Sequence, residues 1–157
     1  MDYAVSFAAN LRRNEVVALI GELGSGKTQF VKGVCQYFQV HSVVSSPTFV
    51  MLHRYQGRGE NGDELLVFHF DLYRIKSSSE MLELGYEEFF HSDGICLIEW
   101  ADKLHQLTPH DRTEIKFSYG SGENERLIEV RRFPKRDRLA ASNLEDTSKA
   151  VDEHLGH

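Results

Sequence analysis

The stretch that decides the fold is VVALIGELGSGKTQF, residues 16–30. It opens with an apolar run, VVALI, that predicts a buried β-strand. The segment that follows, GELGSGKT at residues 21–28, satisfies the pattern GxxxxGK[ST] of a phosphate-binding loop. Glycines let the backbone N–H groups turn inward around phosphates, and the helix after such a loop adds the positive end of its dipole. The stretch therefore predicts a nucleotide-binding loop.

A short pattern can occur by chance, so its surroundings decide what it means. Apolar residues recur at helical spacing from residue 27 to residue 38, which predicts a helix packed on a sheet. These residues are Phe30, Val31, Val34, Cys35 and Phe38. The order strand, loop, helix is the setting that a phosphate-binding loop requires. The alternative is a tight strand-to-helix turn that the glycines make without any ligand.

Lysine, hydroxyl and carboxylate groups supply the expected chemistry. Lys27 would face the β- and γ-phosphates, and the Thr28 hydroxyl would bind Mg²⁺. Hydrolysis or transfer also needs a carboxylate near the metal, at the carboxyl end of a neighbouring strand. Glu99 ends the apolar run ICLIE, and Asp71 ends LLVFHFD in the same way. For either acid the alternative is a polar residue that merely starts a loop.

Four further residues near these runs are candidates for supporting roles. His69 lies inside the second run and is expected to be packed or to support the site, not to act as a general base. SSPTF, residues 45–49, carries the Ser46 and Thr48 hydroxyls on a loop, where switch segments contact the γ-phosphate. A plain proline turn is the alternative for that loop. Trp100 follows Glu99 and either lies at the site or fills the core.

The other elements complete an α/β pattern. GICLIEW suits a strand that is buried on both faces of a parallel sheet, and GSGENE separates two strands that predict an antiparallel edge hairpin. Gly85 is expected to end a helix, with a short second turn after it. Strands are expected at 16–20, 48–55, 64–75, 94–100, 114–119 and 126–133, and helices at 2–12, 27–38 and 77–90. The pattern predicts a P-loop NTPase-like sandwich with a mainly parallel central sheet.

Length and composition limit the organisation. A chain of 157 residues fits one domain, which we expect at 1–133, followed by a tail at 134–157 that is mobile or marginally helical. The net charge of -6 argues against a protein that binds nucleic acid through its global field. Cys35 and Cys96 lie in apolar segments without metal-like spacing. Because there is no long apolar run or secretory start, we expect a cytoplasmic protein without membrane segments.

Five motifs in series carry a family resemblance. GELGSGKTQFVKG, SSPTFV, HFDLYR, ELGYEEFF and ICLIEWADKL have the order and approximate spacing of the TsaE family, over residues 11–133. The resemblance implies a cytoplasmic ATPase, with ATP and Mg²⁺ as cofactors. It also implies that the protein works with TsaB and TsaD to place threonylcarbamoyl on the adenosine beside the anticodon of ANN-decoding tRNAs. Contact with tRNA would be indirect, through the complex.

The resemblance also implies roles for individual residues. Asp71 and Glu99 would be the acids needed for turnover, with the division between metal binding and water orientation left open. Thr48 would belong to the segment that senses the γ-phosphate. The metal would be held at Thr28 and Glu99. The residues expected to contact the nucleotide are Gly21, Glu22, Leu23, Gly24, Ser25, Gly26, Lys27, Thr28, Gln29, Thr48 and Trp100.

Two other functions share these features. A small-molecule P-loop kinase would have the same loop, sheet and acid, but it needs an acceptor pocket and usually a lid, and no lid-sized insertion follows the core strands. A nucleotide-gated adaptor would use ATP binding alone to change the switch segment, with hydrolysis incidental. Phosphate transfer to an added acceptor would identify the kinase, and a turnover-dead variant that keeps its function would identify the adaptor.

Overall fold

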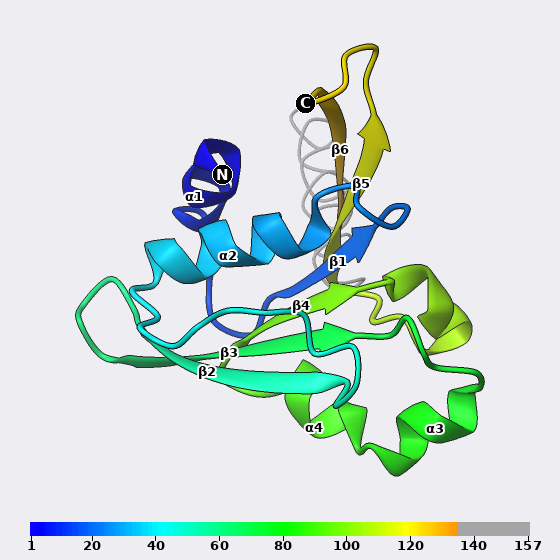
Figure 1. Cartoon of the computed structure of the whole chain (residues 1–157). Coiled ribbons are helices and arrows are strands. Elements are labelled where there is room, and N and C mark those ends of the chain that lie inside the picture. The colour runs from blue at the N-terminus through cyan, green and yellow to red at the C-terminus, as the bar shows by residue number, and fades with distance from the viewer. Residues whose placement is uncertain (135–157) are drawn as a thin grey trace, which may run out of the picture.

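The computed structural model describes residues 1–134, so the predicted tail lies outside the described residues except for Pro134. Six strands form one sheet in the order β2-β3-β4-β1-β5-β6 (Figure 1). The strands are β1 (Val16–Ile20), β2 (Leu52–Arg58), β3 (Glu64–Asp71), β4 (Ile95–Glu99), β5 (Arg112–Tyr119) and β6 (Arg126–Phe133). The helices are α1 (Asp2–Ala8), α2 (Lys27–Tyr37), α3 (Ser78–Glu83), α4 (Tyr86–Phe90) and the 3₁₀ helix η1 (Ala101–Leu107).

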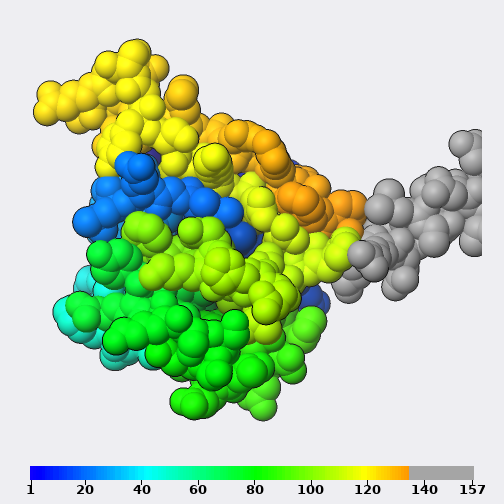
Figure 2. All heavy atoms as spheres, turned by 90° about the vertical axis from the view of Figure 1, so that its right-hand side faces the viewer, coloured from blue at the N-terminus to red at the C-terminus, as the bar shows by residue number. Residues whose placement is uncertain are grey.

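The centre of the sheet is parallel, and both of its edges are antiparallel. β3, β4, β1 and β5 run parallel, whereas β2 pairs antiparallel with β3 and β6 antiparallel with β5. The α/β sandwich with a mainly parallel sheet and an edge hairpin at β5–β6 is therefore confirmed, and β2–β3 adds a second antiparallel pair. Figure 2 shows the tip of the β5–β6 hairpin standing clear of the rest of the molecule.

Helices cover the sheet on both faces (Figure 1). Val17 and Leu19 pack with α1 and α2, and Val16 and Ala18 pack with α3, α4 and η1. This two-sided burial explains why the central strands read as continuous apolar runs. Cys35 and Cys96 are free and buried, and burial raises the pKa of both thiols to about 12.

Some element boundaries differ from the sequence-based prediction. The first helix ends at Ala8, not at residue 12. The strand expected at 48–55 begins at Leu52, because Met51 donates its backbone N–H to the Pro47 carbonyl and takes a φ of 64°. The helix expected at 77–90 is split at Gly85, whose φ is 68°, as its glycine predicts. Among the described residues, no helix is long and apolar enough to span a membrane.

Candidate functional site

The glycine-rich loop joins β1 to α2 at the carboxyl edge of the parallel strands, and three of its glycines are needed for its shape. Gly24 and Gly26 have φ values of 74° and 107°, in the region that side chains disfavour. At Gly21 the obstacle is space, because a Cβ would lie 2.6 Å from Ser25 Oγ and 2.9 Å from the Phe117 carbonyl oxygen. Gly26 also caps α2, so the first N–H groups of the helix open toward the loop.

Lys27 lies folded onto this loop. Its side chain is buried and its ammonium donates to the Gly21 and Glu22 carbonyls. The same Nζ lies 4.0 Å from the centroid of the Trp100 ring. Burial lowers the pKa of Lys27, while Glu99 and, more weakly, other nearby acids act in the opposite direction. A cation is therefore held in a poorly solvated position next to carboxylates, where a phosphate group would stabilise it.

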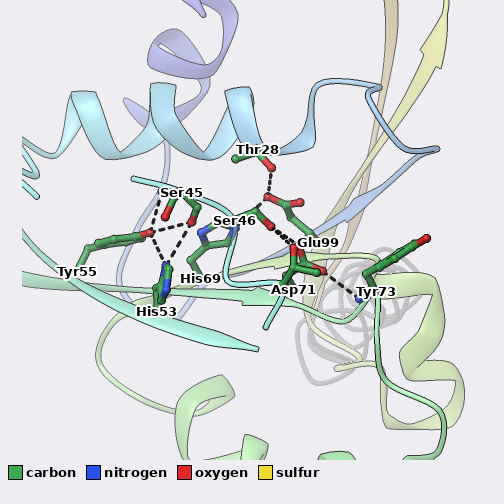
Figure 3. Close-up of polar contacts among 10 residues, drawn as sticks. Thr28, Ser45, Ser46, His53, Tyr55, His69, Asp71, Tyr73 and Glu99 are labelled. Carbon is green, nitrogen blue, oxygen red and sulfur yellow. Dashed lines mark hydrogen bonds and ion pairs between the residues drawn. The ribbon is translucent and has the colours of Figure 1, made fainter. Parts of the chain in front are cut away.

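Glu99 ends β4 beside the loop and is 3% exposed. The register places it opposite Leu19 on β1 and opposite Asp71 on β3. Thr28 Oγ1 donates to Glu99 Oε1 over 2.8 Å, and His69 Nε2 lies 2.9 Å from the same oxygen (Figure 3). The carboxylate is thus tied to the first turn of α2 on one side and to β3 on the other.

Asp71 ends β3 and is 2% exposed, but its partners differ from those of Glu99. Ser46 Oγ donates to Oδ2, and the Tyr73 N–H donates to Oδ1 over 2.9 Å (Figure 3). Thr48 Oγ1 also donates to Oδ2, over 3.1 Å. The two hydroxyls also lie 2.8 Å from each other. Asp71 therefore holds the SSPTF loop against the end of β3.

These groups line a hollow of about 460 Å³. Most of the predicted site residues line it. Ser46 and Tyr73 also line it, although they were not among the residues expected to contact the nucleotide. Gly21 and Glu22 instead line a neighbouring hollow of about 370 Å³ that shares Trp100. The predicted residues in the main hollow are Leu23, Gly24, Ser25, Gly26, Lys27, Thr28, Gln29, Thr48, Asp71, Glu99 and Trp100.

The residues at the hollow fit a magnesium nucleotide. Thr28 and Glu99 offer a hydroxyl and a carboxylate oxygen, which are ligand types that Mg²⁺ prefers. Within residues 1–134, no group of three or more His, Cys, Asp or Glu could hold a metal by protein ligands alone. Mg²⁺ is usually bound by one or two protein oxygens together with phosphate and water.

Comparisons with known proteins agree with this geometry. The model of the family described as "Threonylcarbamoyl adenosine biosynthesis protein TsaE" matches residues 1–128. The tRNA threonylcarbamoyladenosine biosynthesis protein TsaE of Bacillus subtilis is 37% identical over 121 residues, which are 77% of this chain and 72% of that protein. Its namesake in Rickettsia typhi is 40% identical over 110 residues, covering 69% and 72% of the two chains.

A solved structure is also similar. The crystal structure of Bacillus subtilis YdiB aligns with a TM-score of 0.68 and 28% identity, and the match covers 94% of this chain and 87% of that one. The residues that the family model matches include the glycine-rich loop and both strand-ending acids. The chain therefore belongs to the TsaE family of tRNA threonylcarbamoyladenosine biosynthesis proteins and is P-loop NTPase-like, as its motifs predict.

Proposed function

We propose that the protein binds ATP with Mg²⁺ and hydrolyses it in support of TsaB- and TsaD-dependent threonylcarbamoylation of tRNA. One observation carries the proposal: the Thr28 hydroxyl and the Glu99 carboxylate meet 2.8 Å apart beside the glycine-rich loop. In P-loop NTPases the hydroxyl of the loop and an acid at the end of a neighbouring strand together hold the metal. Bound Mg²⁺ would supply charge neutralisation for the phosphates.

The glycine-rich loop and the residues beside it would bind the phosphates. The loop N–H groups and the start of α2 would cradle them, and Lys27 would exchange its carbonyl partners for the β- and γ-phosphates. Glu99 would hold the metal directly or through water. Burial takes the Lys27 ammonium out of water and lowers its pKa. A bound phosphate would stabilise this charge in place of the lost water.

The residues of the SSPTF loop would report whether a γ-phosphate is present. Ser46 and Thr48 donate to Asp71 in the described state, so a γ-phosphate would compete with Asp71 for these hydroxyls. Release of the loop would leave Asp71 free to orient the attacking water. Phe49 and Val50 of this loop are exposed, so little burial of these two side chains is lost when they move, which suits a switch.

TsaB and TsaD would complete the system in the cytoplasm. The names of the relatives place them in threonylcarbamoyladenosine biosynthesis, and the resemblance in sequence implies that TsaB and TsaD take part in it. We therefore assign the transfer to the partner proteins and contact with tRNA to the complex. Two buried free thiols support a reducing compartment.

The test measures phosphate release from ATP by the protein alone, with Mg²⁺, and with TsaB and TsaD added, alongside threonylcarbamoyl incorporation into tRNA. The proposal expects slow release alone, faster release with both partners, and a pull-down of TsaB and TsaD that depends on ATP. Label from the γ-phosphate on an added small molecule would instead identify a kinase. Multiple rounds of tRNA modification without phosphate release would identify a nucleotide-gated adaptor.

A further inference from the structure

His69 is a fully buried polar residue that the proposed chemistry does not yet use. It lies on β3, two residues before Asp71 and on the same face, and its side chain is 0% exposed. Its Nε2 is 2.9 Å from Glu99 Oε1, across the β3–β4 pair (Figure 3). It does not line the nucleotide hollow, whereas Glu99 does.

The two ring nitrogens of His69 have different surroundings, and these fix the tautomer. A carboxylate oxygen can only accept, so Nε2 must carry the hydrogen in its contact with Glu99. Nδ1 is buried and has no hydrogen-bond partner among the described residues. A hydrogen on Nδ1 would therefore be a buried donor without an acceptor, which costs more than an unused lone pair. The ring is expected as the Nε2–H tautomer.

Glu99 has two donors in the described state, and both use Oε1. In the proposed function Thr28 turns its hydroxyl to the metal, which removes one of those bonds. His69 then remains as the side-chain donor that holds the carboxylate, and its ring is fixed by complete burial. Its N–H thereby keeps Oε1 in place when the bond from Thr28 is lost.

We propose that His69 is a positioning residue that holds Glu99 Oε1 and thereby aims the carboxylate at the magnesium nucleotide. This rests on the proposed function, because it assumes that Glu99 acts on the metal or the attacking water. A role in packing alone does not explain an imidazole at this position, since a buried Leu would fill similar space without the cost of desolvating two ring nitrogens. Donors that orient metal ligands in this way are typical of metal sites.

Three variants separate positioning from packing. His69→Gln keeps an N–H donor near the position of Nε2, His69→Leu removes it, and Val67→Ala truncates a fully buried side chain on the same face of β3 without touching Glu99. Phosphate release is measured with TsaB and TsaD at saturating ATP, together with ATP affinity and thermal stability. We expect His69→Leu to lose about 10- to 100-fold in kcat with little change in ATP affinity. His69→Gln should recover most of that loss, and Val67→Ala should lose stability but not turnover.

Two kinetic outcomes would overturn the proposal. One is a His69→Leu protein that turns over as fast as Val67→Ala; the other is a His69→Gln protein that is as slow as His69→Leu. If His69→Leu does not fold, the His69→Gln measurement decides, since loss of turnover in a stable His69→Gln protein would count against positioning by the donor.

A spectrum of the nucleotide-free protein gives a readout that does not depend on activity. Long-range ¹H–¹⁵N correlations of the histidine rings, assigned with His69→Gln, should show the Nε2–H tautomer for His69, and Glu99→Ala should shift its signals. The Nδ1–H tautomer would overturn the inference. Absence of phosphate release from the wild type, with or without partners, would instead overturn the proposed function, while the ring spectrum still tests the contact.

Discussion

Glu99 and Asp71 end neighbouring strands in register with each other, yet they belong to two different halves of the site. Glu99 belongs to the loop half, where its partners are Thr28 on α2 and His69 on β3. Asp71 belongs to the switch half, where its side-chain partners are Ser46 and Thr48 of residues 45–51. Glu99 is held by side chains of a helix and a strand, whereas Asp71 holds a segment without regular secondary structure.

The switch half is held by a small number of hydrogen bonds. Its start is held by the Tyr55 hydroxyl, which donates to the Ser45 carbonyl over 3.1 Å and accepts from the Ser45 N–H over 3.3 Å. Phe49, in the middle of this segment, is 82% exposed, so burial of its ring contributes little to holding the segment in place. The contrast teaches that equal positions at the sheet edge do not imply equal roles: in the proposed function Glu99 would stay in place and Asp71 would exchange partners.

The largest effect is expected from Glu99→Gln, which tests the loop half. The amide keeps nearly the same volume but removes the charge that the metal and the attacking water require. ATP should still bind, and phosphate release should fall by about two to three orders of magnitude. TsaB and TsaD should accelerate the wild type without rescuing the variant, and phosphate release with each protein measures this.

Glu114→Gln is the matched control, because Glu114 lies on β5 of the same sheet and pairs with Arg112. It should leave turnover unchanged. Wild-type rates of repeated tRNA modification by Glu99→Gln would show that hydrolysis is dispensable and that the adaptor is the correct function.

Asp71→Asn tests the switch half and should have a smaller effect on turnover. The amide has one acceptor oxygen in place of two and no charge, so the hydroxyls of Ser46 and Thr48 lose a charged acceptor. Amide exchange in residues 45–51 should become about tenfold faster, because a hydrogen bond to a charged group is worth about 1.5–3 kcal/mol. Hydrogen-exchange mass spectrometry measures this, and Glu99→Gln should leave exchange in that segment unchanged. Equal exchange in both variants would break the proposed distinction.

The parts of this arrangement that are local in sequence could be predicted. The glycine-rich loop, the strand before it and the helix after it follow from residues 16–38, and the apolar runs place Asp71 and Glu99 at strand ends. Parallel packing then brings both acids to the same edge. The family membership was also predictable, because the motifs occur together in one order.

The parts that depend on register or on tertiary contacts could not be predicted. The apolar residues around Met51 favour a strand, but its backbone turns to a φ of 64° where the loop meets Asp71. The contact of His69 with Glu99 requires the register of β3 against β4, which no local pattern contains. A buried histidine two residues before a strand-ending acid is a weak signal that could have indicated it. The different hydrogen-bond partners of the two acids are likewise visible only in the structure.

Thr48→Ala is expected to have a more modest effect on nucleotide choice. If the Thr48 hydroxyl exchanges Asp71 for the γ-phosphate, its removal costs one hydrogen bond to ATP and none to ADP. The ratio of ATP to ADP affinity should fall about fivefold, since one such bond is worth about 1 kcal/mol. Titration calorimetry with both nucleotides measures it. Thr108→Ala is the control, because among the described residues that hydroxyl bonds only the nearby His105 carbonyl. If Thr48→Ala leaves the ratio of ATP to ADP affinity unchanged, Thr48 is a turn residue and not a sensor of the γ-phosphate.

The smallest effect concerns the stability of the nucleotide-free protein, where the two halves should respond in opposite directions. Burial lowers the pKa of Lys27 below its ordinary value of 10.5, so the folded state disfavours the ammonium relative to the unfolded state. Lys27→Met has similar length and no charge. Its melting temperature at neutral pH should be about 2–4 °C above that of the wild type, whereas Asp71→Asn should melt lower because it loses hydrogen bonds.

The stability difference between the wild type and Lys27→Met should depend on pH. Below the folded-state pKa, Lys27 is protonated in both states and the full destabilisation is present; as pH rises through that pKa toward 10.5, the folded state loses its proton first and the destabilisation disappears. The advantage of Lys27→Met should therefore shrink in alkaline solution. Lys76→Met, at an exposed position, should show neither effect.

ATP should raise the melting temperature of the wild type and not that of Lys27→Met, because the ammonium that a phosphate would stabilise is gone. A variant that melts below the wild type without ATP would show that the carbonyl contacts of Lys27 outweigh its burial, and that the loop half is stable before nucleotide arrives.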